Sequence, residues 1–184
     1  MRPDCGAGAK GEPELVAFST WMLKRKLAYR LYLATIRFEG MAWLKIRRKL
    51  LNLPGANIFA NAYVQGTPKV GHSVSFNRNC FIDATGGLTI GNHVSIGHSV
   101  TILSSEHGSD GIIQHQPMIF TPTTIHDNCR IGAHSIILAG VSLAEGTIVA
   151  AGSVVTKSFR EPYCNIAGNP AKIIARRQAF RPGP

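Results

Sequence analysis

The sequence predicts an all-β fold, a parallel β-helix in which short strands coil around one axis. Three observations predict it: aliphatic or aromatic residues recur every six positions, glycine or alanine often follows them, and a small or β-branched residue stands four positions later. A period of six fits neither an α-helix nor an isolated strand, whose side chains alternate with a period of two. It is typical of a short strand and a tight turn, repeated, with three such units completing a triangular coil.

The six-residue register is long enough to exclude chance. It pauses for two residues after Ile82 and for about twenty after Ile102, and each time it resumes. An irregular β-sandwich, the alternative fold, would not keep such a register. In a β-helix these positions point inward and stack from coil to coil: Ile58, Val64, Val70, Phe76, Ile82, Ile90, Ile96, Ile102, Ile125, Ile131, Ile137, Leu143, Val149 and Val155.

The N-terminal part differs in composition from the repeat. Residues 1–52 carry 11 Lys and Arg against 4 Asp and Glu, in a chain whose net charge is +10. We expect residues 1–13 to be disordered and residues 14–52 to form a basic α-helical segment, in which Leu27 and Leu31 share one apolar face. This segment either caps the β-helix or lies on an anionic membrane. We favour the cap, because apolar residues occur on both of its faces.

Composition limits the possible classes of protein. The chain is 45% hydrophobic and 16% charged, which suits a folded domain. Its four cysteines are widely spaced and form no CxxC pair, so we expect neither a disulfide framework nor a zinc site. The first residues lack the apolar stretch of a secretory signal, and no apolar run is long enough to span a bilayer. These features predict a cytoplasmic protein, placed at the inner face of the membrane if the basic segment binds lipid.

The register fails over residues 103–124, which predicts a long excursion from a rigid scaffold. Such excursions usually carry function. This one contains His107, and histidine is the natural general base near neutral pH. A hydroxyl that attacks a carbonyl carbon needs such a base, because it is a good nucleophile only if it loses its proton in the transition state. Glu106 and Asp110 are the nearby acids, and which of them orients the imidazole is left open.

The stretch FNRNCFIDATGGLTIGNHVSIGHSVTILSSEHG, residues 76–108, resembles bacterial sugar O-acetyltransferases of the hexapeptide-repeat acyltransferase family. These include galactoside, maltose, capsule and colanic-acid O-acetyltransferases. The resemblance implies a left-handed β-helix with His107 as the catalytic base and Asn77 as an acceptor contact beside it. We expect Asp83, Glu106 and Asp110 to line the acceptor site. The run SSEHGSD departs from the THxHD or GSHD pattern of many members.

The C-terminal half resembles the coenzyme A site of the same family. The stretches AAGSVVTK and NIAGNPAKII match its GAGSVVTK and AGNPAKVI. The resemblance implies acetyl-CoA as the acyl donor, with no metal required. Lys and Arg are suited to its phosphates. The implied cofactor contacts are Ala139, Gly140, Ala151, Thr156, Lys157, Lys172 and Arg176.

The resemblance also sets the expected organisation. Residues 53–157 are predicted to form the β-helix domain with its loop, and residues 158–184 a C-terminal extension on the coenzyme side. The implied assembly is a homotrimer with each active site between two subunits. Expected partners are an acyl-CoA and a sugar or polysaccharide precursor, and not nucleic acid. The predicted mechanism is direct transfer in a ternary complex, because Cys80 and Cys129 fall at inward positions where a thiol behaves as a small hydrophobe.

Two rival functions use the same fold. The first is a non-catalytic scaffold, since a fold by itself specifies no chemistry. The second is a metal enzyme similar to the γ-class carbonic anhydrases, for which His93 and His98 are the candidate ligands. Their register does not match that family, and the third histidine is missing.

Overall fold

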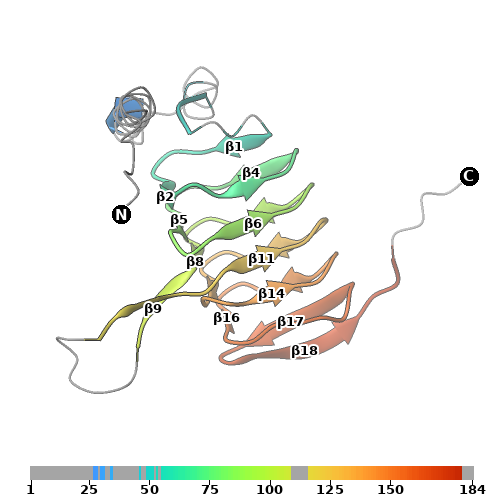
Figure 1. Ribbon diagram of the computed structural model, residues 1–184. Helices are drawn as coiled ribbons and strands as arrows, with labels where there is room; N and C mark the ends of the chain where they lie inside the picture. Colours follow the sequence, from blue (N-terminus) through green and yellow to red (C-terminus); the bar gives the residue numbers. More distant parts are fainter. Residues whose placement is uncertain are drawn as a thin grey trace, which may run out of the picture.

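The chain folds into a three-sided prism of stacked coils (Figure 1). The parallel β-helix predicted from the repeat is therefore confirmed. The computed structural model describes residues 27, 28, 30, 31, 34, 46, 49–51, 53, 55–108 and 116–179.

Three sheets form the sides of the prism, and strands of successive coils pair in parallel within each. The seven-stranded sheet contains β1 (Ala56–Ile58), β4 (Val74–Phe76), β7 (Ser95–Ile96), β12 (Arg130–Ile131), β15 (Ile148–Val149), β17 (Cys164–Gly168) and β18 (Ala171–Arg176). The five-stranded sheet contains β2 (Tyr63–Gly66), β5 (Phe81–Ala84), β8 (Thr101–Ile102), β13 (Ile136–Ile137) and β16 (Val154–Val155). The four-stranded sheet contains β3 (Lys69–Val70), β6 (Leu88–Ile90), β11 (Thr123–Ile125) and β14 (Ser142–Leu143).

Two antiparallel pairs complete the fold. Strands β9 (Ser105–His107) and β10 (Met118–Phe120) form a hairpin that leaves the prism at one corner (Figure 1). It replaces a short turn in the third coil and falls where the repeat is interrupted. At the C-terminal end, β18 folds back on β17 and closes the seven-stranded sheet.

The inward residues form one continuous core. In the seven-stranded sheet Phe76 lies against Ile96 and Ile96 against Ile131, so identical positions of successive coils are in register. Each of the predicted inward residues is buried except Val70, which is half-buried. Burying one such side chain stabilises the fold by about 2 kcal/mol. The prism is therefore a rigid support for the turns and the hairpin that connect its strands.

The glycine that follows many inward residues is required by the close stacking of coils. A Cβ built on Gly97 would lie 2.7 Å from the backbone nitrogen of Ala133 in the next coil. Real Cβ atoms do not approach so closely, so a larger residue would force the coils apart. Pairs such as Ile96-Gly97, which mark the repeat in the sequence, therefore occur where one coil packs closely against the next.

The three corners of the prism are named here by what they carry. The Asn77 corner joins the seven-stranded to the five-stranded sheet. The hairpin corner joins the five-stranded to the four-stranded sheet. The His126 corner joins the four-stranded to the seven-stranded sheet of the next coil. The described residues of the Asn77 corner are 77–79, 97–99, 132–134 and 150–152. Those of the hairpin corner are 85–87, 103–108, 116–122, 138–140 and 156–158. Those of the His126 corner are 71–73, 91–93, 126–128 and 144–146.

Little of the predicted N-terminal segment belongs to the described chain. Residues 1–13 and most of residues 14–52 lie outside it. The described positions from residue 27 to residue 34, together with 46, 49 and 50, are α-helical. Leu27 and Leu31 are 59% and 50% exposed, so their apolar face is uncovered in the single chain. Within the described residues, no helix has the length and apolar character of a membrane span.

Candidate active site

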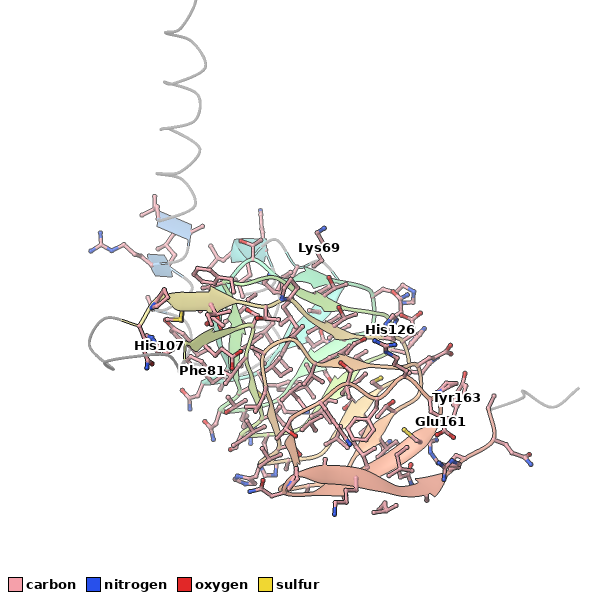
Figure 2. The ribbon with its side chains drawn as sticks, turned by 60° about the horizontal axis from the view of Figure 1, so that its bottom comes forward. Lys69, Phe81, His107, His126, Glu161 and Tyr163 are labelled. Carbon is pink, nitrogen blue, oxygen red and sulfur yellow. The ribbon has the colours of Figure 1, made fainter. Side chains whose placement is uncertain are left out.

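His107 lies at the end of β9, on the hairpin that projects from the prism. Its side chain is exposed, and it makes no side-chain hydrogen bond with another residue of the described chain. Figure 2 places it on the same side of the molecule as Phe81, and away from His126. The imidazole is thus presented to solvent at the end of β9, where a bound hydroxyl can reach it.

The hairpin separates His107 from the acid next to it. Successive residues of a strand point to opposite faces, so Glu106 and His107 lie on opposite faces of β9. The residue directly across the hairpin from His107 is Met118, which shares its face and is 44% exposed. Glu106 is therefore poorly placed to orient the imidazole, and Asp110 lies outside the described residues.

Asp83 lies where the chain leaves the prism to form the hairpin. It follows the pairing of β5 with β8 and is only 4% exposed. One carboxylate oxygen, Oδ2, accepts hydrogen bonds from the Ser105 hydroxyl at 2.5 Å and the Ser104 amide at 3.2 Å. The other, Oδ1, accepts from the Thr85 hydroxyl at 2.5 Å and the Thr85 amide at 2.9 Å. The predicted acceptor contact Asp83 is therefore fully engaged by the protein.

These hydrogen bonds also determine the charge of Asp83. Burial by itself raises the pKa of this carboxyl, but hydrogen bonds from Ser105, Thr85 and Ser104 outweigh it and hold the pKa below its usual value. A carboxyl with a depressed pKa stabilises the fold above its unfolded pKa, and that stabilisation is lost as the pH falls through the folded-state value. Asp83 is thus ionised at neutral pH.

The base of the hairpin is closed by further hydrogen bonds. The Ser104 hydroxyl accepts a hydrogen bond from the Gly86 amide at 2.9 Å. The backbone carbonyl of Ser104 accepts one from the Thr121 amide, also at 2.9 Å. The Gly140 amide in the next coil donates to the Thr121 carbonyl at 3.1 Å. Gly140, a predicted cofactor contact, thus uses its N–H to support the returning strand.

Asn77 stands at the start of its corner, immediately after β4. Its side-chain amide donates to the Ile96 carbonyl at 2.9 Å, which fixes the plane of the amide. The side chain is half-buried, and no described residue donates a hydrogen bond to its carbonyl oxygen. Asn77 can therefore accept a hydrogen bond from a bound hydroxyl.

Within one chain, Asn77 and His107 stand at the two corners that flank the five-stranded sheet, one before its strands and the other after them. Strand β5, which links their corners in the second coil, has four residues. At about 3.3 Å per residue this places the two corners roughly 13 Å apart. Two groups that act on one hydroxyl must each come within about 3 Å of it. One chain alone does not bring these two residues together.

The predicted cofactor contacts divide between the same two corners. The hairpin corner carries Ala139, Gly140, Thr156 and Lys157, and the last two are exposed. The Asn77 corner carries Ala151 and, beside the turn between β17 and β18, Lys172, which pairs with Ala167. Arg176 lies apart, at the His126 corner, where its Nε donates to Glu161 Oε1 at 2.6 Å.

The outer face of the five-stranded sheet is apolar. Tyr63 and Phe81 of neighbouring coils stack with ring centroids 5.5 Å apart. Phe81 is 39% exposed and Ile136, two coils further on, is 36% exposed. The outward positions of the four-stranded sheet are by contrast polar, for example Thr89 and Thr124. An exposed apolar face of this kind is typical of a surface that packs against another protein chain.

The cysteines are removed from this chemistry. Cys80, Cys129 and Cys164 are buried in the core. Burial raises the pKa of the Cys80 thiol, and it raises that of Cys129 to about 12. Because the thiolate is the nucleophile, neither is suited to form an acyl-enzyme.

Comparison with known proteins agrees with this geometry. Residues 122–157 match the family described as bacterial transferase hexapeptide (six repeats). This part of the β-helix therefore carries a hexapeptide repeat of the bacterial transferase type. The predicted resemblance to the hexapeptide-repeat acyltransferases is thereby confirmed.

Relatives of this hexapeptide-repeat protein include acetyltransferases of known structure. A hexapeptide-repeat containing acetyltransferase of Vibrio cholerae, solved in complex with acetyl coenzyme A, is 26% identical with a TM-score of 0.66, and the match covers 92% of each chain. A maltose O-acetyltransferase of Clostridium difficile shares the fold, with a TM-score of 0.67 at 21% identity over 86% of this chain and 88% of that chain.

Sequence relatives match parts of the hexapeptide-repeat chain. The galactoside O-acetyltransferase of Escherichia coli is 28% identical over 137 residues, which is 70% of this chain and 67% of that protein. A relative from Schizosaccharomyces pombe is 37% identical over 101 residues, 54% of this chain. The chain spans about half the length of the first curated relatives, 48% for the Schizosaccharomyces pombe protein and 54% for one from Staphylococcus aureus.

The hexapeptide-repeat structure also bears on the metal-enzyme alternative. His93 lies at the His126 corner and His98 at the Asn77 corner, with β7 between them, so they do not share one site. Among the described residues, no three His, Cys, Asp or Glu gather as a metal site would require. His98 instead packs edge to face on His134, with ring centroids 5.0 Å apart. This pair of histidines was not singled out from the sequence. Counting corner positions along the repeat would have placed both of them at the same corner in successive coils.

Proposed function

We propose that this protein is an acetyltransferase that moves an acetyl group from acetyl-CoA to a hydroxyl of a sugar or of a cell-surface polysaccharide precursor. The observation that carries the proposal is the exposed imidazole of His107, held on the hairpin that leaves the prism where the repeat is interrupted. The acetyl-CoA complex of the Vibrio cholerae relative supports the donor. The galactoside O-acetyltransferase relative supports a sugar hydroxyl as the acceptor.

In the proposed reaction His107 is the general base. It takes the proton of the acceptor hydroxyl as the oxygen attacks the thioester carbonyl carbon. The carbon–sulfur bond then breaks, and the imidazolium returns the proton to the coenzyme A thiolate. Asn77 accepts a hydrogen bond from the acceptor and holds it in place. The buried thiols of Cys80 and Cys129, whose pKa values burial raises, support direct transfer without an acyl-enzyme.

We propose further that the active unit is a homotrimer whose three prisms turn their five-stranded sheets toward a common threefold axis. Cyclic trimers are a permitted closed assembly. In this arrangement the Asn77 corner of one subunit meets the hairpin corner of the next. His107 and Asn77 then face one groove, and so do Lys157 and Ala151. The apolar outer face with Phe81 and Ile136 supports this packing.

The direct test is an acyl-CoA-dependent screen. Purified protein is incubated with acetyl-CoA and a panel of sugars and polysaccharide fragments, and free thiol release is followed together with calorimetry of CoA binding. Turnover that depends on one acceptor class supports the proposal. A protein that binds no CoA and releases no thiol with any acceptor would instead favour a non-catalytic scaffold.

Lys157 should contribute to acetyl-CoA binding and not to the chemical step. Replacing Lys157 with Ala is expected to raise KM for acetyl-CoA about tenfold with kcat nearly unchanged, because a charge-assisted hydrogen bond to a phosphate is lost. Steady-state kinetics with varied acetyl-CoA measure this. The matched control is Lys69→Ala, an exposed lysine of β3 on the four-stranded sheet (Figure 2), which should leave KM unaltered. Equal effects of the two substitutions would contradict the assignment of Lys157.

We propose a cytoplasmic location at the inner membrane face. The exposed Leu27 and Leu31, together with the excess of Lys and Arg in residues 1–52, support contact of the basic segment with anionic lipid. Sedimentation with vesicles should retain the protein on anionic vesicles at low salt and release it at high salt. Equal binding to neutral vesicles, or no binding to either kind, would contradict this contact.

A further inference from the structure

We propose that Asp83 is a positioning residue, a buried carboxylate that anchors the His107 hairpin and sets the direction of the imidazole. This inference rests on the proposed acetyl transfer for its kinetic consequence, although the anchor itself is a property of the fold. It gives Asp83 a role other than contact with the acceptor.

The first support is the position of Asp83 along the repeat. In β5, Phe81 points outward and Ile82 points inward, so alternation places Asp83 on the outer side. It is nevertheless 4% exposed, while Phe81 on the same side is 39% exposed. The difference arises because β5 runs beside β8 and the chain leaves β8 to form the hairpin at this level. The departing strand covers Asp83.

The second support is that the two carboxylate oxygens of Asp83 accept hydrogen bonds from different segments of the chain. Oδ1 binds only Thr85, within its own corner. Oδ2 binds only the hairpin, through the Ser104 amide and the Ser105 hydroxyl. The carboxylate therefore links a corner of the second coil to Ser104 and Ser105, near the start of the excursion. Charge-assisted hydrogen bonds of this kind are stronger than neutral ones and hold geometry well.

The third support is the face of β9 on which the anchor acts. Ser105 and His107 are two residues apart in a strand, so they share a face. Fixing the Ser105 hydroxyl to Asp83 thus restrains twisting of the face that carries the imidazole. Glu106 lies on the opposite face and has no such link. In this way a carboxylate that need not touch the substrate governs where the catalytic base points.

The test uses three single substitutions in the full-length protein. Ser105→Ala removes a hydrogen bond on the hairpin side of Asp83, and Asp83→Asn disturbs both sides. The matched control Thr85→Val removes a hydrogen bond from the same carboxylate on the side away from the hairpin. We expect kcat to fall about 10-fold for Ser105→Ala and about 100-fold for Asp83→Asn, since small displacements of a reacting group have effects of this size. The Kd for acetyl-CoA should not change, and Ser105→Thr, which keeps the hydroxyl, should restore kcat.

A second measurement does not depend on turnover. Amide hydrogen exchange at residues 104–108 should become faster in Ser105→Ala and Asp83→Asn, and stay as in the wild type in Thr85→Val. If Asp83→Asn does not fold, Ser105→Ala and Ser105→Thr decide the question. Faster exchange in Ser105→Ala, combined with no acetyl transfer by the wild-type protein, would support the anchor and refute the proposed function. Unchanged exchange and unchanged kcat in Ser105→Ala, or equal losses in Thr85→Val, would overturn the role of Asp83.

Discussion

Replacing His107 with Ala should lower kcat for acetyl transfer by about 10²- to 10⁴-fold, the usual contribution of a general base. The acceptor hydroxyl then has no group to take its proton as it attacks the thioester. The Kd for acetyl-CoA and the melting temperature should stay close to those of the wild type. The side chain is exposed on a hairpin and packs into no core, so its removal creates no cavity. Stopped assays of acetyl transfer and thermal denaturation measure the two quantities.

His126→Ala is the matched control for this experiment. His126 is also an exposed histidine, but it lies at the corner farthest from the proposed groove, on the other side of the molecule in Figure 2. Its removal should leave kcat unchanged. A His107→Ala protein that turns over like the wild type, or a loss of equal size in His126→Ala, would remove His107 from the mechanism.

Placing a charge on the five-stranded sheet should dissociate the trimer and abolish activity together. In Phe81→Asp a carboxylate would have to be buried between subunits without a partner, which is strongly unfavourable. Within the single chain the same change is mild, because Phe81 is 39% exposed. We therefore expect a folded monomer with less than about 1% of wild-type turnover, since breaking an interface with an unpaired buried charge costs several kcal/mol. Light scattering measures the mass, and circular dichroism the fold.

Thr89→Asp provides the comparison, because Thr89 points outward from the same coil on the four-stranded sheet. This protein should remain a trimer of full activity. The account of the assembly fails if Phe81→Asp stays trimeric, or if it becomes monomeric and keeps its turnover.

The repeat could be predicted from the sequence because stacking imposes a strict register. Inward residues recur every six positions, and each stacks on its equivalent in the next coil, as Ile58 does on Phe76. Ile96 stacks on Ile131 across the interruption, which therefore stands out against the period. The position of the hairpin followed from the same count. The choice of His107 within it came from the resemblance to the sugar O-acetyltransferases, because the interruption also contains a second histidine, His115.

The environment of Asp83 could not be predicted from alternation or from composition. Alternation places its side chain on the outer side, and only the path of the departing hairpin shows that it is covered. The same limit applies to Arg176, whose place beside Glu161 depends on how β18 folds back on β17. Glu106 was an open candidate until the strand pairing of β9 put it on the face opposite His107.

The division of the site between two corners is likewise a property of the coil. Asn77 and His107 belong to one stretch of sequence that resembles the family, although β5 separates their corners in the structure. Sequence resemblance supplied the trimer as an expectation. In the proposed trimer, the corners on either side of one apolar sheet would each contribute half of a groove.

The central claim is that each active site takes His107 from one subunit and Asn77 from the next, and subunit mixing tests it most directly. His107→Ala and Asn77→Ala chains, each nearly inactive alone, are co-expressed in equal amounts and the trimers purified. Every mixed cyclic trimer then contains one site with both residues intact, so random assembly should restore about a quarter of wild-type turnover. Activity no greater than that of the two separate variants would show that the site is not shared between subunits in this way.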